Sequence, residues 1–598
     1  MSTESTADTD VDAATIEVIR NYMTSAATEM QRTLIRTAYN TIIYEILDFG
    51  ISIYDRNLNL VADSPGLALF LGANDYGIEK AVEHVGEENM EPGDVIIMNF
   101  PYWSGTHTLD VLLFSPVFHD DELVGYTTCR AHWLDLGAKD SGYVLDSTDV
   151  HQEGVIFPGT KVYEGGEPDE EILDIIRYNS RMPDKVIGDL NAQIAAVNTG
   201  KERLQELYDK YGGDTTEAAI DQIHAHGERT AREVVEDLPD GEWTATGYAD
   251  GTDPDREEPI ELRTTVRIEG DQFTVDFSGS AGEVDEPLNI PPGMTETVCK
   301  LCFKTVTTPD EESNAGQYDP LNVEVPEDNI FNASYPAPTF TIWTAIVAID
   351  VVYEALAQAL PEEVPASSGG DLCDVMLFGE NPETGRQFVE ANNEGVGWGA
   401  GVDHDGANAL MHISETMVRN IPVEVFENKA PIRFRQLSLR EDSAGAGKHR
   451  GGLGIRRDYE ITQPVGALSI IQKTRTEGWG LEGGRPGAKN VVALEPDADD
   501  EDWQDRIQVL VDNDDLYEDA EGTKYAGMFR GTFVPGEVIS NRTGGGGGYG
   551  DPFDRDPEAV RDDVIDGYVS REAAREEYGV AITENREIDW EETESLRS

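Results

Sequence analysis

The chain has 598 residues, about four times the size of a common domain, so several cores or one elaborate core are expected. Acidic residues number 117 against 45 Lys and Arg, which gives a formal net charge of −72 at pH 7. Such a surface repels nucleic-acid phosphates, and the 39% of hydrophobic residues, with 8 Trp, 22 Tyr and 18 Phe, exclude disorder throughout the chain.

The acidic residues are spread over the whole length rather than gathered in one tail. This pattern predicts a halophilic protein from a high-salt cytosol, where salt screens repulsion between carboxylates beyond about 3 Å at 1 M. The N-terminus is acidic and polar, without the pattern of a secretory signal. No apolar stretch approaches 18 residues, and the most apolar window, Phe340 to Tyr353, contains Asp350. We therefore expect a soluble cytoplasmic protein that does not contact membranes.

Hydrophobic periodicity predicts the elements in chain order. Apolar residues recur every three or four positions from Ile16 to Leu34, which predicts a long amphipathic helix running towards Tyr44. Short strands are expected over residues 51–54 and 95–98, and helices from Pro168 to about Leu238. Strands are again expected over residues 262–277 and in the region 431–511.

These patterns divide the chain into six predicted regions. In order they are a disordered acidic leader (1–12), an N-terminal α/β region with a metal-site hairpin (13–165), a helical region (166–240), a central α/β region (241–430), a β-rich region (431–540), and a glycine-rich turn with a C-terminal helical segment (541–598).

Only four cysteines occur, and two of them, Cys299 and Cys302, form a C-x-x-C pair. No second pair accompanies it, so zinc or redox chemistry is disfavoured. The segment Met294 to Val306 reads as an apolar helix on which these residues share a face, which predicts two packed thiols.

The stretch from Asn99 to Asp140 is the richest in chemistry. The quartet His119-Asp-Asp-Glu122 separates two β-prone runs and predicts a hairpin in which Phe118 pairs with Leu123. Within one residue of slippage, that register sets Asp110 beside His132 at the open end, and His107 in the entering loop can reach the same point. Two imidazoles and a carboxylate suit Zn, Mn or Fe(II), although ordinary hydrogen bonding at strand ends is an equal alternative on spacing alone. Asp135 could be a fourth ligand or could orient an imidazole.

Two glycine-rich stretches are ambiguous. The stretch Gly445 to Gly452 is not a phosphate loop of the Walker type, because His449 follows the lysine and the glycine spacing is wrong. Five glycines from Gly544 to Gly548 could form a flexible linker or a turn on which the backbone closes.

Together these stretches resemble the hydantoinase B / acetone carboxylase alpha-subunit family, which includes the corresponding half of ATP-dependent 5-oxoprolinase. The resemblance covers nearly the whole chain. The matching stretches are Leu47-Asp48-Phe49, Gly93-Asp94-Val95, Pro101-Tyr102, Gly105-Thr106-His107 with Asp110, His132 with Asp135, Glu153-Gly154, Gly188-Asp189-Leu190, Asp276-Phe277-Ser278-Gly279, Arg450-Gly-Gly-Leu-Gly454 and Gly545 to Pro552.

The resemblance implies a mixed α/β (α+β), multi-lobed subunit that works with a hydantoinase A-type subunit in a hetero-oligomer. It implies that the partner, an actin-like ATPase, uses ATP and Mg to phosphorylate the carbonyl oxygen of a substrate, and that the B-type subunit holds the metal site. His107, Asp110 and His132 fall on the ligand positions of the carboxylase members. Asp135 and Glu153 are candidates for the general base.

Three hypotheses about function follow. The first is ATP-dependent opening of a cyclic amide, such as a hydantoin, 5-oxoproline or a lactam. The second is ATP-dependent carboxylation of a ketone, favoured by the aromatic pair Tyr102-Trp103, which could line a pocket near His107, and disfavoured by the length of the chain. The third is a scaffold without catalysis, which predicts no bound metal.

Overall fold

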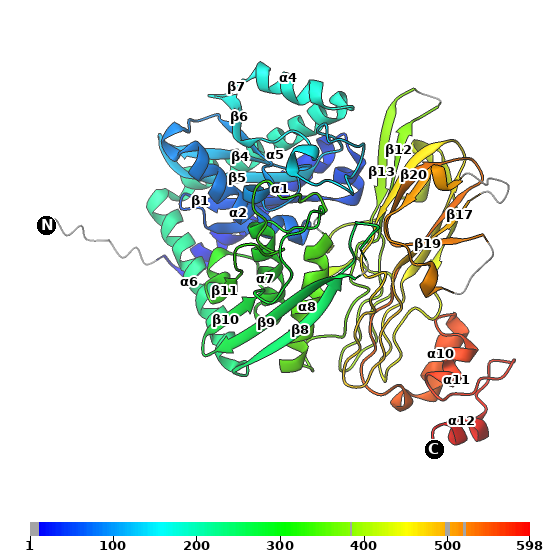
Figure 1. The fold of residues 1–598 in the computed structure, drawn as a ribbon. Helices are drawn as coiled ribbons and strands as arrows, with labels where there is room; N and C mark the ends of the chain where they lie inside the picture. Colours follow the sequence, from blue (N-terminus) through cyan, green and yellow to red (C-terminus); the bar gives the residue numbers. More distant parts are fainter. Residues whose placement is uncertain (1–10, 257, 342, 383–384, 497–502, 518–521) are drawn as a thin grey trace.

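The computed structural model describes residues 11–256, 258–341, 343–382, 385–496, 503–517 and 522–598. Figure 1 shows two lobes, with the blue to green part of the chain in the larger lobe and the yellow to red part in the smaller one. The expected mixed α/β fold is confirmed, because helices pack on four sheets. Most of the predicted disordered leader lies outside the described residues, and Asp12 caps the first helix by accepting hydrogen bonds from Ala14 N and Thr15 N.

The larger lobe is built on an antiparallel sheet of seven strands in the order β2-β1-β5-β4-β3-β6-β7. The predicted strands at residues 51–54 and 95–98 are confirmed as parts of β1 and β3. The strands are β1 (Phe49–Asp55), β2 (Leu60–Asp63), β3 (Val95–Met98), β4 (Asp110–His119), β5 (Glu122–His132), β6 (Pro158–Glu164) and β7 (Glu167–Pro168).

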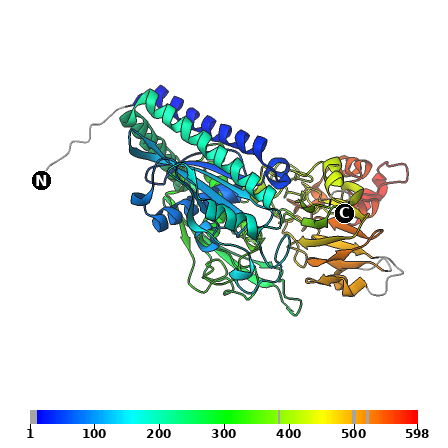
Figure 2. The same ribbon diagram turned by 90° about the horizontal axis from the view of Figure 1, so that it is seen from above.

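Helices cover both faces of this sheet. Successive odd and even residues of β5 point to opposite faces, so Thr127 bonds Val197 O of α5 (Pro183–Tyr211) whereas Arg130 bonds Asn74 of α2 (Ala68–Val85). The long α1 (Ala13–Thr37) lies beside α5, as Figure 2 shows from above. The remaining helices of this part are α3 (Pro101–Ser104), α4 (Glu170–Asn179) and α6 (Gly213–Asp237).

The first helix ends earlier than the sequence predicts. Its buried stripe is as expected, but α1 stops at Thr37 and a π-helical turn follows over Ile42–Ile46. The carboxylate of Asp189 accepts hydrogen bonds from the backbone N–H groups of Tyr39 (2.7 Å) and Asn40 (3.1 Å). These donors are therefore diverted from the helical ladder, which breaks the helix there.

A second, four-stranded sheet lies below the first in Figure 1, in the order β11-β10-β9-β8. The two thiols Cys299 and Cys302 are buried and free on α7 (Pro292–Thr307), so the prediction of packed cysteines is confirmed. The other elements are β8 (Gly241–Ala249), β9 (Ile260–Glu269), β10 (Gln272–Asp276), β11 (Leu321–Glu324) and α8 (Trp343–Ala359).

The smaller lobe contains two five-stranded sheets, in the orders β13-β12-β16-β20-β18 and β14-β15-β21-β17-β19. The first of these sheets joins strands from both sides of residue 430, so the predicted division there does not coincide with a sheet boundary. The strands are β12 (Asp374–Glu380), β13 (Gln387–Asn392), β14 (Ile432–Leu439), β15 (Ile455–Ile461), β16 (Val465–Ile470), β17 (Val491–Glu495), β18 (Ile507–Val509), β19 (Lys524–Ala526), β20 (Phe529–Phe533) and β21 (Val538–Arg542), and the helices are α9 (Val423–Lys429), α10 (Pro557–Asp566), α11 (Arg571–Glu576) and α12 (Trp590–Leu596).

The five consecutive glycines form part of the packed interior. Gly546 N donates to Gly452 O (3.0 Å) and Gly548 N donates to Arg485 O (2.9 Å). A Cβ on Gly545 would lie 1.8 Å from Ser443 O, which no side chain could tolerate. Of the two readings that the sequence left open, the structure therefore has the closed backbone packing rather than a flexible linker.

One hydrophobic cluster extends from Ala26 to Ile539 through both lobes. Among the helices of the described segments, none is long and apolar enough to cross a lipid bilayer.

Candidate metal centre

The hairpin of β4 and β5 sets two of the predicted ligands opposite each other. Phe118 pairs with Leu123 beside the turn, and Asp110 pairs with His132 at the open end. A bulge between Val117 and Phe118 supplies the single residue of slippage. The register predicted from the sequence is therefore confirmed.

His107 reaches the same point because the chain turns sharply just before it. The short helix α3 ends at Gly105, whose φ of 79° is a left-handed conformation that favours glycine. The chain then turns back towards the start of β4, where His107 Nε2 lies 3.4 Å from Asp110 Oδ2.

Arg130 connects the turn that contains His107 to the sheet through hydrogen bonds. This buried guanidinium donates to both the hydroxyl and the carbonyl oxygen of Ser104, each at 2.8 Å, and also to the hydroxyl of Thr106. Its Nε donates to Asn74 Oδ1 at 2.8 Å. Arg130 lies on the same strand as His132, so one strand positions both histidines.

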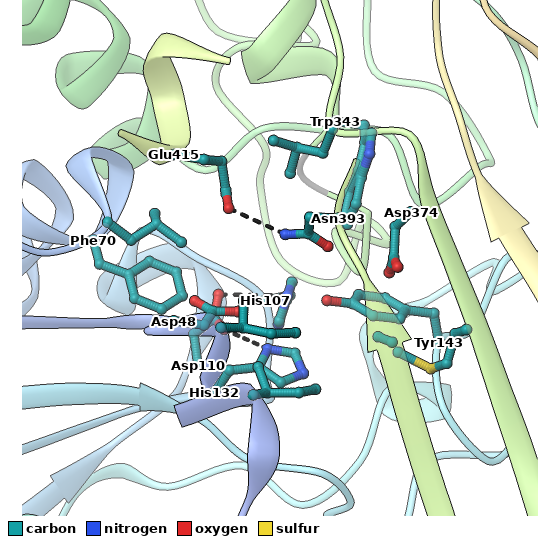
Figure 3. Close-up of a pocket in the computed structure, with 16 residues that line it drawn as sticks. Asp48, Phe70, His107, Asp110, His132, Tyr143, Trp343, Asp374, Asn393 and Glu415 are labelled. Carbon is teal, nitrogen blue, oxygen red and sulfur yellow. Dashed lines mark hydrogen bonds and ion pairs between the residues drawn. The ribbon is translucent and has the colours of Figure 1, made fainter. Parts of the chain in front are cut away.

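The three side chains converge at one point, as Figure 3 shows. His132 Nδ1 is 2.9 Å from Asp110 Oδ1, and one candidate ligand atom from each residue lies within 4.8 Å of the other two. Bonds of about 2.0–2.2 Å to a shared ion would need separations of at most roughly 4.4 Å, so a movement of a few tenths of an ångström suffices. The ring of Phe340 stacks on His107, and Tyr143 packs against both imidazoles, which fixes their orientation.

Burial controls the protonation of this group. It lowers the pKa of His107 well below its usual range, with a smaller contribution from His132, and it also lowers the pKa of His132. The same burial raises the pKa of Asp110 well above its usual range. Both imidazoles are therefore neutral, which is the form that binds metals, and a cation would release the proton from Asp110.

Several buried polar atoms at this point have no hydrogen-bond partner among the described residues. They include His107 Nδ1, Asp110 Oδ2 and Asp48 Oδ1. Unpaired buried polar atoms are costly, and a cation shared by the three converging side chains would satisfy a free ligand atom of His107 and of Asp110. In the part of the chain that the structure describes, no other group of three or more His, Cys, Asp or Glu side chains converges in this way. The residues present thus fit a divalent metal ion.

A narrow cavity adjoins the three side chains, and its volume for water-sized molecules is about 30 Å³. That is roughly room for two waters. It is lined mainly by apolar side chains, among them Phe70, Tyr143 and Trp343. A cyclic substrate could enter only if the surrounding segments moved apart.

Three further carboxyl groups line this cavity, and sequence analysis assigned none of them to the site. They are Asp48 at the start of β1, Asp374 at the start of β12, and Glu415. Burial raises the pKa of Asp48 to about 7 and the pKa values of Asp374 and Glu415 well above their usual range. The motif Leu47-Asp48-Phe49 was the only available signal, because the other two groups arrive from distant segments.

The two candidates for the general base are held elsewhere. Asp135 Oδ1 pairs with Arg181 Nη1 at 2.6 Å. Glu153 Oε1 accepts hydrogen bonds from Thr339 N (2.9 Å) and Phe340 N (3.1 Å), and from the hydroxyl of Ser147 (2.8 Å). Neither is among the described residues that line the cavity. Their geometry fits structural roles, and their catalytic role stays a prediction.

The aromatic pair Tyr102-Trp103 also lies away from the cavity lining within the described chain. The Tyr102 hydroxyl donates to Ala337 O, and Trp103 packs against His84 and Phe100. The pair therefore does not line this cavity, and a place for it in a substrate pocket stays a prediction. Phe70, Tyr143 and Trp343 form the aromatic wall instead.

The glycine stretch at residues 445–452 does not cradle an anion either. Gly445 N donates to Gly546 O (2.8 Å) and Gly452 N to Trp398 O (2.7 Å), so these donors are used in packing.

Comparison with known proteins decides the family. The family model described as Hydantoinase B/oxoprolinase matches residues 12–552. The chain belongs to this family. The match begins at the cap of α1 and extends through the whole metal-site hairpin to the five glycines, so the resemblance found in the sequence is confirmed.

Members of the hydantoinase B/oxoprolinase family resemble this chain over nearly its full length. An uncharacterised protein of Methanocaldococcus jannaschii is 33% identical over 98% of this chain and 100% of its own. A putative B-type D-/L-hydantoinase subunit of a Pseudomonas strain is 31% identical, covering 98% of each chain. The beta chain of the caprolactamase of Pseudomonas jessenii is 31% identical, covering 98% of this chain and 99% of its own.

Two solved structures have the same fold. The crystal structure of ATP-dependent caprolactamase from Pseudomonas jessenii matches with a TM-score of 0.87 and 27% identity, covering 98% of this chain and 100% of the other. A nucleotide-free acetone carboxylase structure matches with a TM-score of 0.86 over 98% of this chain and 82% of the other, and its 19% identity shows the fold alone.

Proposed function

We propose that this chain is the B-type subunit of an ATP-dependent hydrolase that opens cyclic amides, and that it processes a carbonyl-phosphorylated intermediate beside His107, Asp110 and His132. The observation that carries the proposal is the convergence of these three side chains beside a narrow cavity that three further carboxyl groups also line. It is supported by similarity along the whole chain to proteins named as a caprolactamase subunit and a hydantoinase subunit.

Phosphorylation solves the chemical problem of this substrate class. The ring amide is stabilised by resonance, so water attacks it slowly. A phosphoryl group on the carbonyl oxygen withdraws electrons from the carbon and converts that oxygen into a good leaving group. Attack of one water on this carbon, followed by cleavage of the C–N bond with transfer of a proton to the departing nitrogen, gives an acyl phosphate. A second water then hydrolyses the acyl phosphate to the ring-opened amino acid and phosphate.

His107, Asp110 and His132 would hold the metal ion, for which Zn, Mn and Fe(II) are the best candidates from the donor set. The ion would supply Lewis acidity and would lower the pKa of a water molecule. Arg130 acts through the His107 turn as a positioning residue, because its hydrogen bonds to Ser104 and Thr106 fix the distance between the ligands.

We place the general base at Asp48 rather than at Asp135 or Glu153. Asp48 lines the cavity, its Oδ1 has no partner among the described groups, and burial brings its pKa to about 7. A base that titrates near neutral pH accepts a proton from water more readily than an ordinary aspartate.

The names of the relatives describe subunits, so chains of this kind work in hetero-oligomers. We propose a hydantoinase A-type ATPase as the partner and place ATP with Mg on that subunit.

The test is product analysis with the chain co-expressed with its A-type partner in molar KCl. Hydantoins, 5-oxoproline, lactams and small ketones are each supplied with ATP and bicarbonate, and products are identified by mass. A ring-opened amino acid formed with stoichiometric phosphate supports the proposal. A ketone carboxylated by incorporation of bicarbonate would replace it with the carboxylase function. Full turnover by the His107→Ala variant would indicate that the chain serves only as a scaffold.

A further inference from the structure

A second cavity lies close to the metal centre and shares none of its described lining residues. Its volume is about 210 Å³, and it lies between α8 and the segments that contain Ser367, Trp398 and Trp479. Trp343 of α8 lines the metal cavity and Asp350 lines the second one. Seven helical residues separate them, which corresponds to roughly 10 Å along the helix.

The walls of this cavity are mainly apolar, and its size suits one ring. A cavity of about 150 Å³ in another protein holds benzene, so 210 Å³ has room for a six- or seven-membered ring. Most polar groups at the wall already have partners. Thr305 Oγ1 lies 2.9 Å from the Tyr353 hydroxyl, and Ser367 Oγ donates to Asp350 Oδ2 at 3.2 Å.

His412 and Trp479 are the exceptions among the lining residues described. The His412 side chain is fully buried and lines the cavity. Its Nδ1 lies 2.8 Å from the Ser414 hydroxyl and accepts a hydrogen bond from Ser414 N at 3.3 Å, and a backbone N–H can only donate. That contact leaves the proton on Nε2, which has no partner among the residues described. Burial lowers the pKa of His412 to about 4, so the ring is a neutral donor at physiological pH. The indole N–H of Trp479, another lining residue, is likewise buried and unpaired within the described structure.

Charge at the wall selects against anions. Asp350 and Glu363 line the cavity. The ammonium group of Lys473 already pairs with Asp350 Oδ2 at 2.9 Å. A ligand here would therefore be neutral, apolar over most of its surface, and equipped with one oxygen that accepts a hydrogen bond.

We propose that this cavity is a second ligand site, which binds a small neutral ring carrying a carbonyl group, with His412 Nε2 donating to the carbonyl oxygen. The ring chemistry follows from the cavity itself, whereas its identification with the cyclic amide substrate rests on the proposed function. The turn Ile413–Glu415 separates the two cavities, because Ile413 lines the second cavity and Glu415 lines the metal cavity. A ring bound in the second cavity would thus be separated from the metal cavity by this one turn.

The test measures binding of ε-caprolactam to the full-length chain by ligand-detected NMR, without ATP or partner, together with a crystal soak that locates the ring. The His412→Asn variant keeps an acceptor for Ser414 N, but its shorter side chain cannot place a donor at the position of Nε2. We expect it to weaken binding about fivefold or more, the usual effect of one lost hydrogen bond. Val306→Phe fills the cavity from α7 and should weaken binding without changing any polar group.

Two controls make the result decisive. Binding should persist in His107→Ala, and cyclohexanecarboxylate, an anion of similar ring size, should bind more weakly than the lactam. Absence of lactam binding would overturn the proposal, as would a lactam located in the metal cavity or binding that both His412→Asn and Val306→Phe leave unchanged. Because the assay contains no ATP, failure of the proposed catalytic function would leave this result standing.

Discussion

Asp110 lies directly across the β4–β5 ladder from His132, and its Oδ1 is 2.9 Å from His132 Nδ1. The other oxygen of Asp110 lies 3.4 Å from His107 Nε2. A single buried carboxyl group thus lies between two neutral imidazoles.

Removal of a ligand should empty the metal site. We expect His107→Ala and Asp110→Ala to lose most of the metal that the wild-type chain retains, measured by elemental analysis after dialysis. His404→Ala is the matched control, because the His404 side chain is 65% exposed and lies outside the site. Full metal occupancy in either ligand variant would contradict the assignment.

The Asp48→Asn variant separates the general base from the ligands. We expect the turnover number of the complex to fall about 10²–10⁴-fold while the metal content is retained, because proton transfer is lost but the three ligands remain. Asp135→Asn should instead lower mainly the stability, since it breaks the pair with Arg181. A larger loss of turnover in Asp135→Asn than in Asp48→Asn would return the role of base to Asp135.

Replacing Arg130 with lysine tests the support of the His107 turn. Lysine keeps the charge but cannot reproduce the forked contacts to Asn74, Ser104 and Thr106. We expect a loss of about 2–4 kcal/mol in the free energy of unfolding and a roughly 10–100-fold weaker affinity for metal. The control Arg267→Lys, on an exposed part of β9, should change the stability by about 0.5 kcal/mol or less. Unchanged metal affinity in Arg130→Lys would show that the turn containing His107 keeps its position without the contacts of Arg130.

Glu153 makes stability depend on pH. Burial raises its pKa from 4.5 to about 7, so the folded chain keeps a proton that the unfolded chain releases. Its stabilising contribution is fully present below about pH 4.5 and is lost as the pH rises to about 7, a change of about 3 kcal/mol.

The Glu153→Gln variant should remove that dependence. Glutamine keeps Oε1 as the acceptor for Thr339 N and Phe340 N, and its amide can donate to the Thr339 hydroxyl. The free energy of unfolding should be measured with denaturant at pH 5 and pH 7.5. Relative to the wild type, the variant should be more stable at pH 7.5 than at pH 5, whereas the exposed control Glu584→Gln should show no such change. A constant difference between the variant and the wild type would contradict the raised pKa.

The net charge of −72 predicts a strong dependence on salt. Raising KCl from about 0.1 M to 1 M shortens the screening length from about 10 Å to 3 Å, so repulsion between surface carboxylates should weaken and the melting temperature should rise. A parallel sucrose series controls for general solute exclusion. A melting temperature that does not respond to KCl would remove the physical basis for placing the protein in a high-salt cytosol.

The sequence by itself determined the hairpin and identified the three candidate ligands. Asp110 and His132 are paired through a short turn, so their register depends only on residues between them, and the turn at Gly105 brings His107 back over a few residues more. The family resemblance also followed from ordered motifs along the chain. The role of the glycines stayed open, because neighbouring residues cannot show that Ser443 and Gly452 will pack on Gly545 and Gly546.

Only the tertiary structure decided which other groups surround the ligands. Asp374 and Glu415 come from segments more than 200 residues beyond the hairpin, and they reach the cavity because the core is continuous between the lobes. The same packing pairs Asp135 with Arg181, and it places Glu153 where it accepts a hydrogen bond from Thr339 N, away from the cavity. Local strand pairing is set by hydrogen bonds within one stretch of chain. Which residues line a cavity depends instead on how distant segments pack against one another.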